Sequence, residues 1–314
     1  MEGLPAGVHR AGHVVRFVRR LATDEPEPSL PPPLPPGRIV LIPGRGETFV
    51  REQEGPEGAL PVLLLHGWTA SADLTFFAVY PELRRRHPVI ALDHRGHGRG
   101  IRAEEPFTLE ACADDAAGLL EELGVRRAIV AGYSMGGAIS FLLWRRHPQL
   151  VAGLVMSGTA LEWRTTARER MVWRSLAVLE LGLRVSTGEG FVLRYLRQAA
   201  EDSPEVAPLR GWVAGESRRG YTPDVVAAGK ALAEFGAADY AGSIGVPSAT
   251  VVTARDRLVL PREQHALATA LDSPVFPVDG DHDAPLVKPT EFARAMGKAV
   301  ASVNERATAA DRGG

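Results

Sequence analysis

The segment 132–136, which reads Gly-Tyr-Ser-Met-Gly, is the part of the sequence best suited to nucleophilic chemistry. It directly follows an apolar run at 127–131 and directly precedes a helical pattern. A serine at such a strand-to-helix turn has strained backbone angles, and the residues two before and two after it must lack bulk. Gly132 and Gly136 meet that need, and the helix N-terminus places a positive dipole end beside a developing anion. We therefore predict that Ser134 is a nucleophile.

Two further segments, each at the end of a predicted strand, precede this serine. The first is His66-Gly67-Trp68, and the second, at 92–98, reads Leu-Asp-His-Arg-Gly-His-Gly. With the Gly-x-Ser-x-Gly pattern, these segments resemble the α/β-hydrolase fold family over about residues 38–303. The resemblance implies that the backbone N–H groups of Trp68 and Met135 bind the oxyanion, and that His66 is structural rather than catalytic.

A serine hydroxyl needs a general base, and the resemblance implies the chain order serine, acid, histidine. Of the nine histidines, only His282 lies downstream of the last predicted strand, at 275–278, and it occupies a loop. His265 lies inside a predicted helix, where a solvated or packed side chain is the simpler interpretation. We therefore predict that His282 is the general base.

The acid that orients this histidine has three candidates. Asp256 follows the apolar run 248–253, where the family places its acid, whereas Asp281 and Asp283 flank His282. Adjacent side chains usually point apart, so neither flanking aspartate easily reaches the imidazole. The other acid position that some members use, after the sixth strand, holds Ser-Gly-Thr and no carboxylate. We predict Asp256 as the third member of the triad.

The resemblance implies a cofactor-free hydrolase of carboxylic esters that acts through an acyl-enzyme, with no metal site. Two alternatives keep the triad: a perhydrolase or haloperoxidase, and a carbon–carbon bond hydrolase. A third is a non-catalytic binding protein on the same scaffold, which would normally lack the serine or the histidine. Epoxide hydrolases and haloalkane dehalogenases use aspartate as nucleophile, so Ser134 argues against them. Tyr133 replaces the commoner histidine, a variation that leaves the chemistry intact.

The elements that must position these residues alternate between short apolar runs and helical patterns. Such alternation predicts an α/β fold with a doubly wound, mostly parallel sheet. A hairpin is expected to precede the parallel strands. The predicted strands lie at 38–43, 48–52, 61–65, 89–92, 127–131, 150–156, 248–253 and 275–278, and the predicted helices at 73–85, 109–123, 135–146 and 289–303.

The chain divides into four regions on composition and pattern. Residues 1–37 hold an amphipathic segment at 6–22, with interleaved arginines, and a proline-rich linker. Residues 38–159 and 241–303 form the predicted hydrolase core, and 160–240 a helical lid inserted into it. Residues 304–314 are predicted to be a disordered tail.

The amino-acid composition limits the classes of partner that the protein is expected to bind. Lys and Arg total 36 against 38 for Asp and Glu, so no global field attracts nucleic acid. Cys112 is the single cysteine, which rules out an internal disulfide. No run reaches the length of a membrane helix, and we expect a cytoplasmic enzyme of unspecified oligomeric state. Its expected partner is a small hydrophobic ester. Residues 6–22 are expected to pack on the domain as a short helix, and contact with a membrane surface is the alternative.

Overall fold

The computed structural model describes residues 28–164, 203–220 and 222–313, and an α/β sandwich is built from them. One sheet has the strand order β1-β2-β4-β3-β5-β6-β7-β8. Strands β1, β2 and β4 pair antiparallel, and every pairing from β4 through β8 is parallel. The predicted fold class is therefore confirmed. The bounds are β1 (Gly37–Ile42), β2 (Gly46–Gln53), β3 (Val62–Leu65), β4 (Val89–Leu92), β5 (Ala128–Tyr133), β6 (Val151–Ser157), β7 (Ser248–Thr253) and β8 (Val275–Val278).

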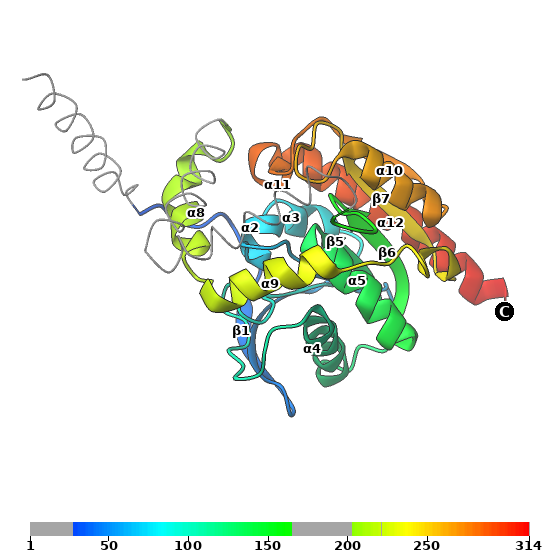
Figure 1. Cartoon of the computed structure of the whole chain (residues 1–314), viewed down its shortest axis with the longest axis horizontal. Coiled ribbons are helices and arrows are strands. Elements are labelled where there is room, and N and C mark those ends of the chain that lie inside the picture. The colour runs from blue at the N-terminus through cyan, green and yellow to red at the C-terminus, as the bar shows by residue number, and fades with distance from the viewer. Residues whose placement is uncertain (1–27, 165–202, 221, 314) are drawn as a thin grey trace, which may run out of the picture.

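Helices cover both faces of this sheet (Figure 1). Successive residues of β3 alternate between two hydrophobic clusters, because a strand points its side chains to opposite faces. One cluster includes helices α4 (Leu109–Glu122), α5 (Met135–Arg146) and α10 (Pro261–Ala270). The other includes α2 (Ala72–Phe76), α3 (Val79–Leu83), α11 (Ala284–Val287) and α12 (Pro289–Gly313). Both faces of the central strands β3, β4 and β5 are thereby buried, as their apolar sequences require.

The predicted helix at 73–85 was wrong in one respect, because the chain forms two short helices there. Helix α2 ends at Phe76 and α3 begins at Val79. Pro81 has no backbone N–H to donate to the carbonyl of Phe77, and its ring would clash with that carbonyl in a continuous helix. The break therefore follows from one residue.

The prediction of a disordered tail from residue 304 was also wrong. Helix α12 continues to Gly313. Val300, Val303 and Ala307 are buried at helical spacing, so the apolar face that docks on the sheet extends past 303. Arg306 also donates from Nη2 to the carbonyl oxygen of Ser248 on β7.

The region predicted as a lid is described only in part. Helices α8 (Arg210–Ser217) and α9 (Thr222–Glu234) fall within it, and Figure 1 shows α9 running across the molecule near α5. Residues 165–202 lie outside the described residues, as do residues 1–27, which include the amphipathic segment. Short 3-10 turns lie at Pro148–Leu150, Ala207–Leu209 and Ala241–Ser243. Of the helices in the described part, none has both the length and the apolar composition needed to cross a membrane.

Candidate active site

Ser134 lies at a sharp turn between β5 and α5. Its backbone angles are φ 55° and ψ −116°, outside the regions that L-residues normally adopt. A Cβ added to Gly132 would lie 2.3 Å from the carbonyl oxygen of Gly136, and one added to Gly136 would lie 1.9 Å from the carbonyl oxygen of Leu65. Only glycine fits at these two positions, so the turn has the steric form that the sequence predicted.

Three of the predicted site residues come together from three separate loops. Ser134 Oγ lies 3.0 Å from His282 Nε2, and His282 Nδ1 lies 2.8 Å from Asp256 Oδ2. The carboxylate faces Nδ1, so that nitrogen carries the proton and Nε2 is left to accept from the serine hydroxyl. Ser134 and Asp256 are both buried. The arrangement can remove a proton from Ser134 and hold the resulting imidazolium beside a negative charge.

Asp256 is held by several donors besides the histidine. Its Oδ1 accepts from the backbone N–H groups of Leu258 at 2.9 Å and Val259 at 2.8 Å. Its Oδ2 accepts from Thr253 Oγ1 at 2.7 Å and lies 3.1 Å from Gln264 Nε2. Neither Thr253 nor Gln264 was predicted from the sequence as a site residue. Gln264 precedes Leu267 and Ala268 by three and four residues, so helical spacing places it on the buried side of α10 with them. This spacing was the one feature of the sequence that could have marked the glutamine as buried.

Of the two rival aspartates, Asp281 contacts backbone N–H groups. The carboxylate of Asp281 accepts from the backbone N–H groups of Arg257 and of His282 itself, each at 2.8 Å. Burial raises the pKa of Asp281, but these bonds and the guanidinium of Arg257 outweigh it and lower the pKa overall. Asp283 immediately precedes α11. Among the three aspartates, the structure therefore places Asp256 against the imidazole.

The predicted oxyanion donors lie on either side of the serine. Met135 is the first residue of α5, directly after Ser134. Trp68 follows Gly67, and a Cβ on Gly67 would lie 3.4 Å from Ser134 Cβ. The indole Nε1 of Trp68 donates to the carbonyl oxygen of Val225 on α9 at 2.6 Å. The indole N–H of Trp68 is thus engaged by α9, and the proposed contact with an oxyanion involves its backbone N–H instead.

Three buried histidines lie next to this corner. His66 Nε2 accepts from the backbone N–H of His94 at 2.9 Å, so its Nδ1 carries the proton and donates to the carbonyl oxygen of Gly67 at 2.8 Å. Ring centroids lie 4.4 Å apart for His66 and His94 and 5.7 Å apart for His66 and His97. Burial lowers the pKa of His66 to about 4 and of His97 to about 3, and lowers the pKa of His94 well below its ordinary value. Both nitrogens of His66 are engaged away from Ser134, as a structural residue requires.

A buried charge network fixes the chain just after the oxyanion segment. Asp93 accepts from the backbone N–H groups of Ala72 and Arg99, each at 2.8 Å. Burial raises the pKa of Asp93, against the opposing charge of Arg99. Burial alone would raise the pKa of Asp73 too, but hydrogen bonds from Arg51 and Arg99 lower it overall. These contacts join β2, the start of α2 and the loop after β4 into one rigid support.

Tyr133 connects the nucleophile strand to the histidine loop. Its hydroxyl donates to the carbonyl oxygen of His282, and the two rings lie 5.3 Å apart between centroids. Its ring also packs edge-on against Phe292 of α12 at 5.5 Å. Tyr133, which the sequence suggests is a neutral variation, therefore has a structural contact with His282.

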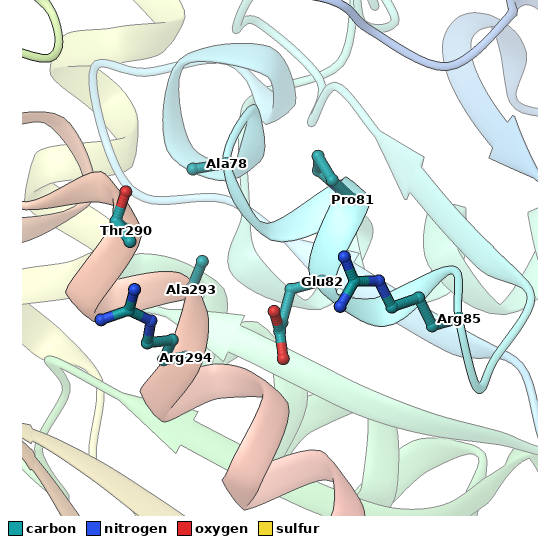
Figure 2. Close-up of a pocket in the computed structure, with 7 residues that line it drawn as sticks. All are labelled: Ala78, Pro81, Glu82, Arg85, Thr290, Ala293 and Arg294. Atoms are coloured by element: carbon teal, nitrogen blue, oxygen red, sulfur yellow. The ribbon is translucent and has the colours of Figure 1, made fainter.

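No metal-binding cluster of three or more His, Cys, Asp or Glu residues occurs within the described residues. A hollow of about 330 Å³ lies between α3 and α12, and Figure 2 shows Glu82 between Arg85 and Arg294 on its wall. These helices pack on the face of the sheet opposite α4 and α5, and Ser134, His282 and Asp256 are not among the residues that line it. The hollow is therefore separate from the candidate active site.

A mostly parallel sheet with a strained serine at the strand-to-helix turn defines the class of α/β hydrolases. The family model for the alpha/beta hydrolase fold matches residues 61–185. A pimeloyl-[acyl-carrier protein] methyl ester esterase of Neisseria meningitidis is 30% identical over 212 residues, which cover 66% of this chain and 79% of that protein. The chain belongs to the α/β-hydrolase fold family.

Other relatives show how varied that family is. A putative non-heme haloperoxidase of Mycobacterium phage D29 is 27% identical over 73% of this chain and 83% of its own length. The acetyltransferase component of an acetoin cleaving system from Pseudomonas putida is 36% identical, but the match spans only 28% of that protein. Among solved structures, an esterase from Exiguobacterium antarcticum has a TM-score of 0.73 at 19% identity, over 85% of this chain and all of its own.

Proposed function

We propose that this chain is a serine hydrolase that cleaves carboxylic esters with a hydrophobic acyl or alcohol part through an acyl-enzyme. The observation that supports the proposal is the continuous path of hydrogen bonds from Ser134 through His282 to Asp256, at 3.0 and 2.8 Å. The path begins at a serine whose strained backbone angles are those of a nucleophile at a strand-to-helix turn. A binding protein without catalytic activity would have no need of this arrangement.

The first half of the reaction transfers the acyl group to the enzyme. His282 Nε2 takes the proton of Ser134 as Oγ attacks the ester carbonyl carbon. The carbonyl oxygen becomes an oxyanion, for which the proposed donors are the backbone N–H groups of Trp68 and Met135. When the tetrahedral intermediate collapses, the bond to the alcohol oxygen breaks, and His282 returns its proton to that oxygen. The alcohol leaves and Ser134 is acylated.

The second half releases the acid. His282 Nε2 takes a proton from water, and the oxygen of that water attacks the acyl carbon. The bond to Ser134 Oγ then breaks and the proton is returned to the serine. Asp256 keeps Nδ1 protonated throughout, so Nε2 is the nitrogen that takes up the proton at the start of each half-reaction and gives it back at the end.

The apolar character of the described surroundings supports a hydrophobic substrate. Trp68 is bound to α9, and the ring centroids of Phe141 on α5 and Phe235 after α9 lie 6.2 Å apart. Ala228 and Leu232 of α9 are buried in the same cluster as Met135. The core cluster that α9 shares with Met135, and against which Trp68 packs, is apolar, and this favours an apolar part of the substrate.

Perhydrolysis is the second candidate, because the phage relative is named as a haloperoxidase. The acyl-enzyme would be the same, but hydrogen peroxide rather than water would give a proton to His282 and attack the acyl carbon. The product would then be a peracid. Adding hydrogen peroxide to an ester reaction and assaying the peracid by bromide oxidation distinguishes the two, since simple hydrolysis yields none.

Ser134→Ala tests the proposal. It should reduce turnover of p-nitrophenyl esters by roughly 10³-fold or more while the thermal transition stays near that of the wild type. A fluorophosphonate probe should label Ser134 in the wild type and lose that label in the variant. Ser140→Ala is the matched control, because Ser140 is also buried and donates only to the carbonyl oxygen of Gly136. Equal activity in Ser134→Ala and the wild type would refute the assignment.

A further inference from the structure

The side chain of Gln264 lies beneath the acid of the triad and is fully buried. It comes from α10, whose buried positions are otherwise apolar. The amide Nε2 lies 2.7 Å from the carbonyl oxygen of Val259, 2.8 Å from Thr253 Oγ1 and 3.1 Å from Asp256 Oδ2. The amide Oε1 accepts from the backbone N–H of Thr253 at 3.0 Å. A buried amide with this many partners needs a reason beyond packing.

The number of hydrogens on each group determines which atom donates and which accepts in these contacts. The Thr253 backbone N–H can only donate, so Oε1 faces it and Nε2 faces the acceptors. The amide NH₂ has two hydrogens, and its two shortest contacts are with Val259 O and Thr253 Oγ1. The Thr253 hydroxyl, which accepts from Nε2, then points its own hydrogen at Asp256 Oδ2, 2.7 Å away. The resulting path runs from Gln264 to Thr253 to Asp256.

The same carboxylate oxygen also faces His282 Nδ1, at 2.8 Å. Oδ1 is held by the backbone N–H groups of Leu258 and Val259, and Gln264 holds the carbonyl of Val259 as well. The glutamine therefore contacts both sides of the loop that presents the acid: the end of β7 at Thr253 and the far side at Val259. Rotation of the carboxylate would break contacts on both sides at once.

We propose that Gln264 is a positioning residue for the triad, which orients the Thr253 hydroxyl and the loop 254–259 so that Asp256 Oδ2 is directed at His282. The inference rests on the proposed function and extends it to two residues that do not touch substrate. Misplacement of a catalytic group by about 1 Å can cost up to about 100-fold in rate. Loss of the amide should therefore lower kcat and leave KM nearly unchanged.

The main variants remove the hydrogen bonds while keeping the shape. Gln264→Met should lower kcat for p-nitrophenyl esters by about 10- to 100-fold, with KM within about 2-fold of wild type. Thr253→Val should lower kcat by a similar factor, and Thr253→Ser, which keeps the hydroxyl, should restore most of it. Thr250→Val is the matched control on the same strand, since the Thr250 hydroxyl contacts Ser273 Oγ at 2.6 Å and not the acid. That control should keep wild-type kcat.

A double-mutant cycle tests whether the two residues act through one path. If they do, the loss in kcat of Gln264→Met with Thr253→Val should be clearly smaller than the product of the two single losses. Multiplying losses would mean independent roles and would overturn the proposed path. So would wild-type kcat in Gln264→Met, or an equal loss in Thr250→Val. Thermal unfolding and circular dichroism show whether each variant still folds. If Gln264→Met does not fold, the kcat of Thr253→Val compared with that of Thr250→Val tests the hydrogen-bond path.

A readout without substrate separates this inference from the proposed function. In ¹⁵N-histidine-labelled protein, the Nδ1–H proton of His282 should give a downfield, slowly exchanging resonance when held by Asp256. Gln264→Met should broaden or shift that resonance, and Thr250→Val should not. An inactive wild type with this behaviour would refute ester hydrolysis but leave the positioning role standing. An active wild type whose resonance is unchanged by Gln264→Met would refute the positioning role alone.

Discussion

Asp256 and Asp281 approach His282 from two loops, but their carboxylates face different atoms of it. Asp256 faces the imidazole Nδ1, whereas Asp281 accepts from the backbone N–H of the same residue. Asp256→Asn removes the charge that fixes the tautomer and stabilises the imidazolium, so kcat should fall by roughly 10³- to 10⁴-fold. Asp281→Asn should lower kcat by about 10-fold or less, since only the loop is loosened. Steady-state rates and thermal transitions of both variants test this, and the reverse order would assign the acid to Asp281.

Tyr133 adds a second restraint on the base. Its hydroxyl donates to the His282 carbonyl oxygen, so Tyr133→Phe should free that carbonyl while keeping the ring contact. We expect kcat to fall by about 3- to 10-fold with little change in KM, because loss of one buried hydrogen bond loosens the loop without removing a reacting group. Tyr80→Phe is the control: Tyr80 is buried too, and its hydroxyl contacts Asp73 at 3.4 Å. Equal losses in the two variants would argue against a specific role for Tyr133.

At the scale of elements, the turn between β5 and α5 depends on how closely α5 approaches β3. Gly136→Ala would place a Cβ 1.9 Å from the carbonyl oxygen of Leu65, and backbone cannot move aside as a flexible side chain could. We expect destabilisation of about 3 kcal/mol or more, measured by urea unfolding. Gly215→Ala on α8 is the matched control, because a Cβ there meets nothing within 4 Å. It should be neutral or stabilise by up to about 1 kcal/mol, since alanine has the higher helix propensity.

The positions of helices and strands could be predicted where the local sequence alone determines them. The runs 89–92, 248–253 and 275–278 match β4, β7 and β8 in full. The sequence of β4 is uninterrupted and apolar because this strand is buried at every position. Thr108 accepts from the N–H of Ala111 at 3.0 Å, as an N-cap should. The break caused by Pro81 was visible in the sequence but its consequence was missed.

The residues that surround the site were harder to predict from the sequence. The proposed nucleophile, base and acid are each marked by a motif or by position after a strand, and the structure brings those three residues together. Gln264 and Thr253 have no such mark, since their importance depends on which side chains the fold places across from them. A buried polar residue in a helix can be recognised from spacing, but its partner depends on tertiary structure.

At the scale of the whole molecule, the three buried histidines couple folding to pH. His66, His94 and His97 are neutral in the folded protein because burial lowers the pKa of each, to about 4 for His66 and about 3 for His97. In the unfolded chain each has a pKa near 6.5, so between about pH 6.5 and 4 the unfolded state binds protons that the folded state does not. The free energy of unfolding must therefore fall as pH is lowered through this window, and each histidine contributes a slope of about 1.4 kcal/mol per pH unit.

A single substitution isolates this contribution. In His97→Gln the slope between pH 6.5 and 4 should be smaller than in the wild type by about 1.4 kcal/mol per pH unit, because one proton fewer is taken up on unfolding. The raised pKa of Asp93 acts in the opposite direction and the lowered pKa of His87 in the same direction, but both remain in the two proteins and cancel in the comparison. Urea unfolding at closely spaced pH values measures the slopes. His265→Gln, which removes an exposed histidine on α10, should leave the wild-type slope in place. If His97→Gln also keeps that slope, the buried cluster does not cause the acid sensitivity of the fold.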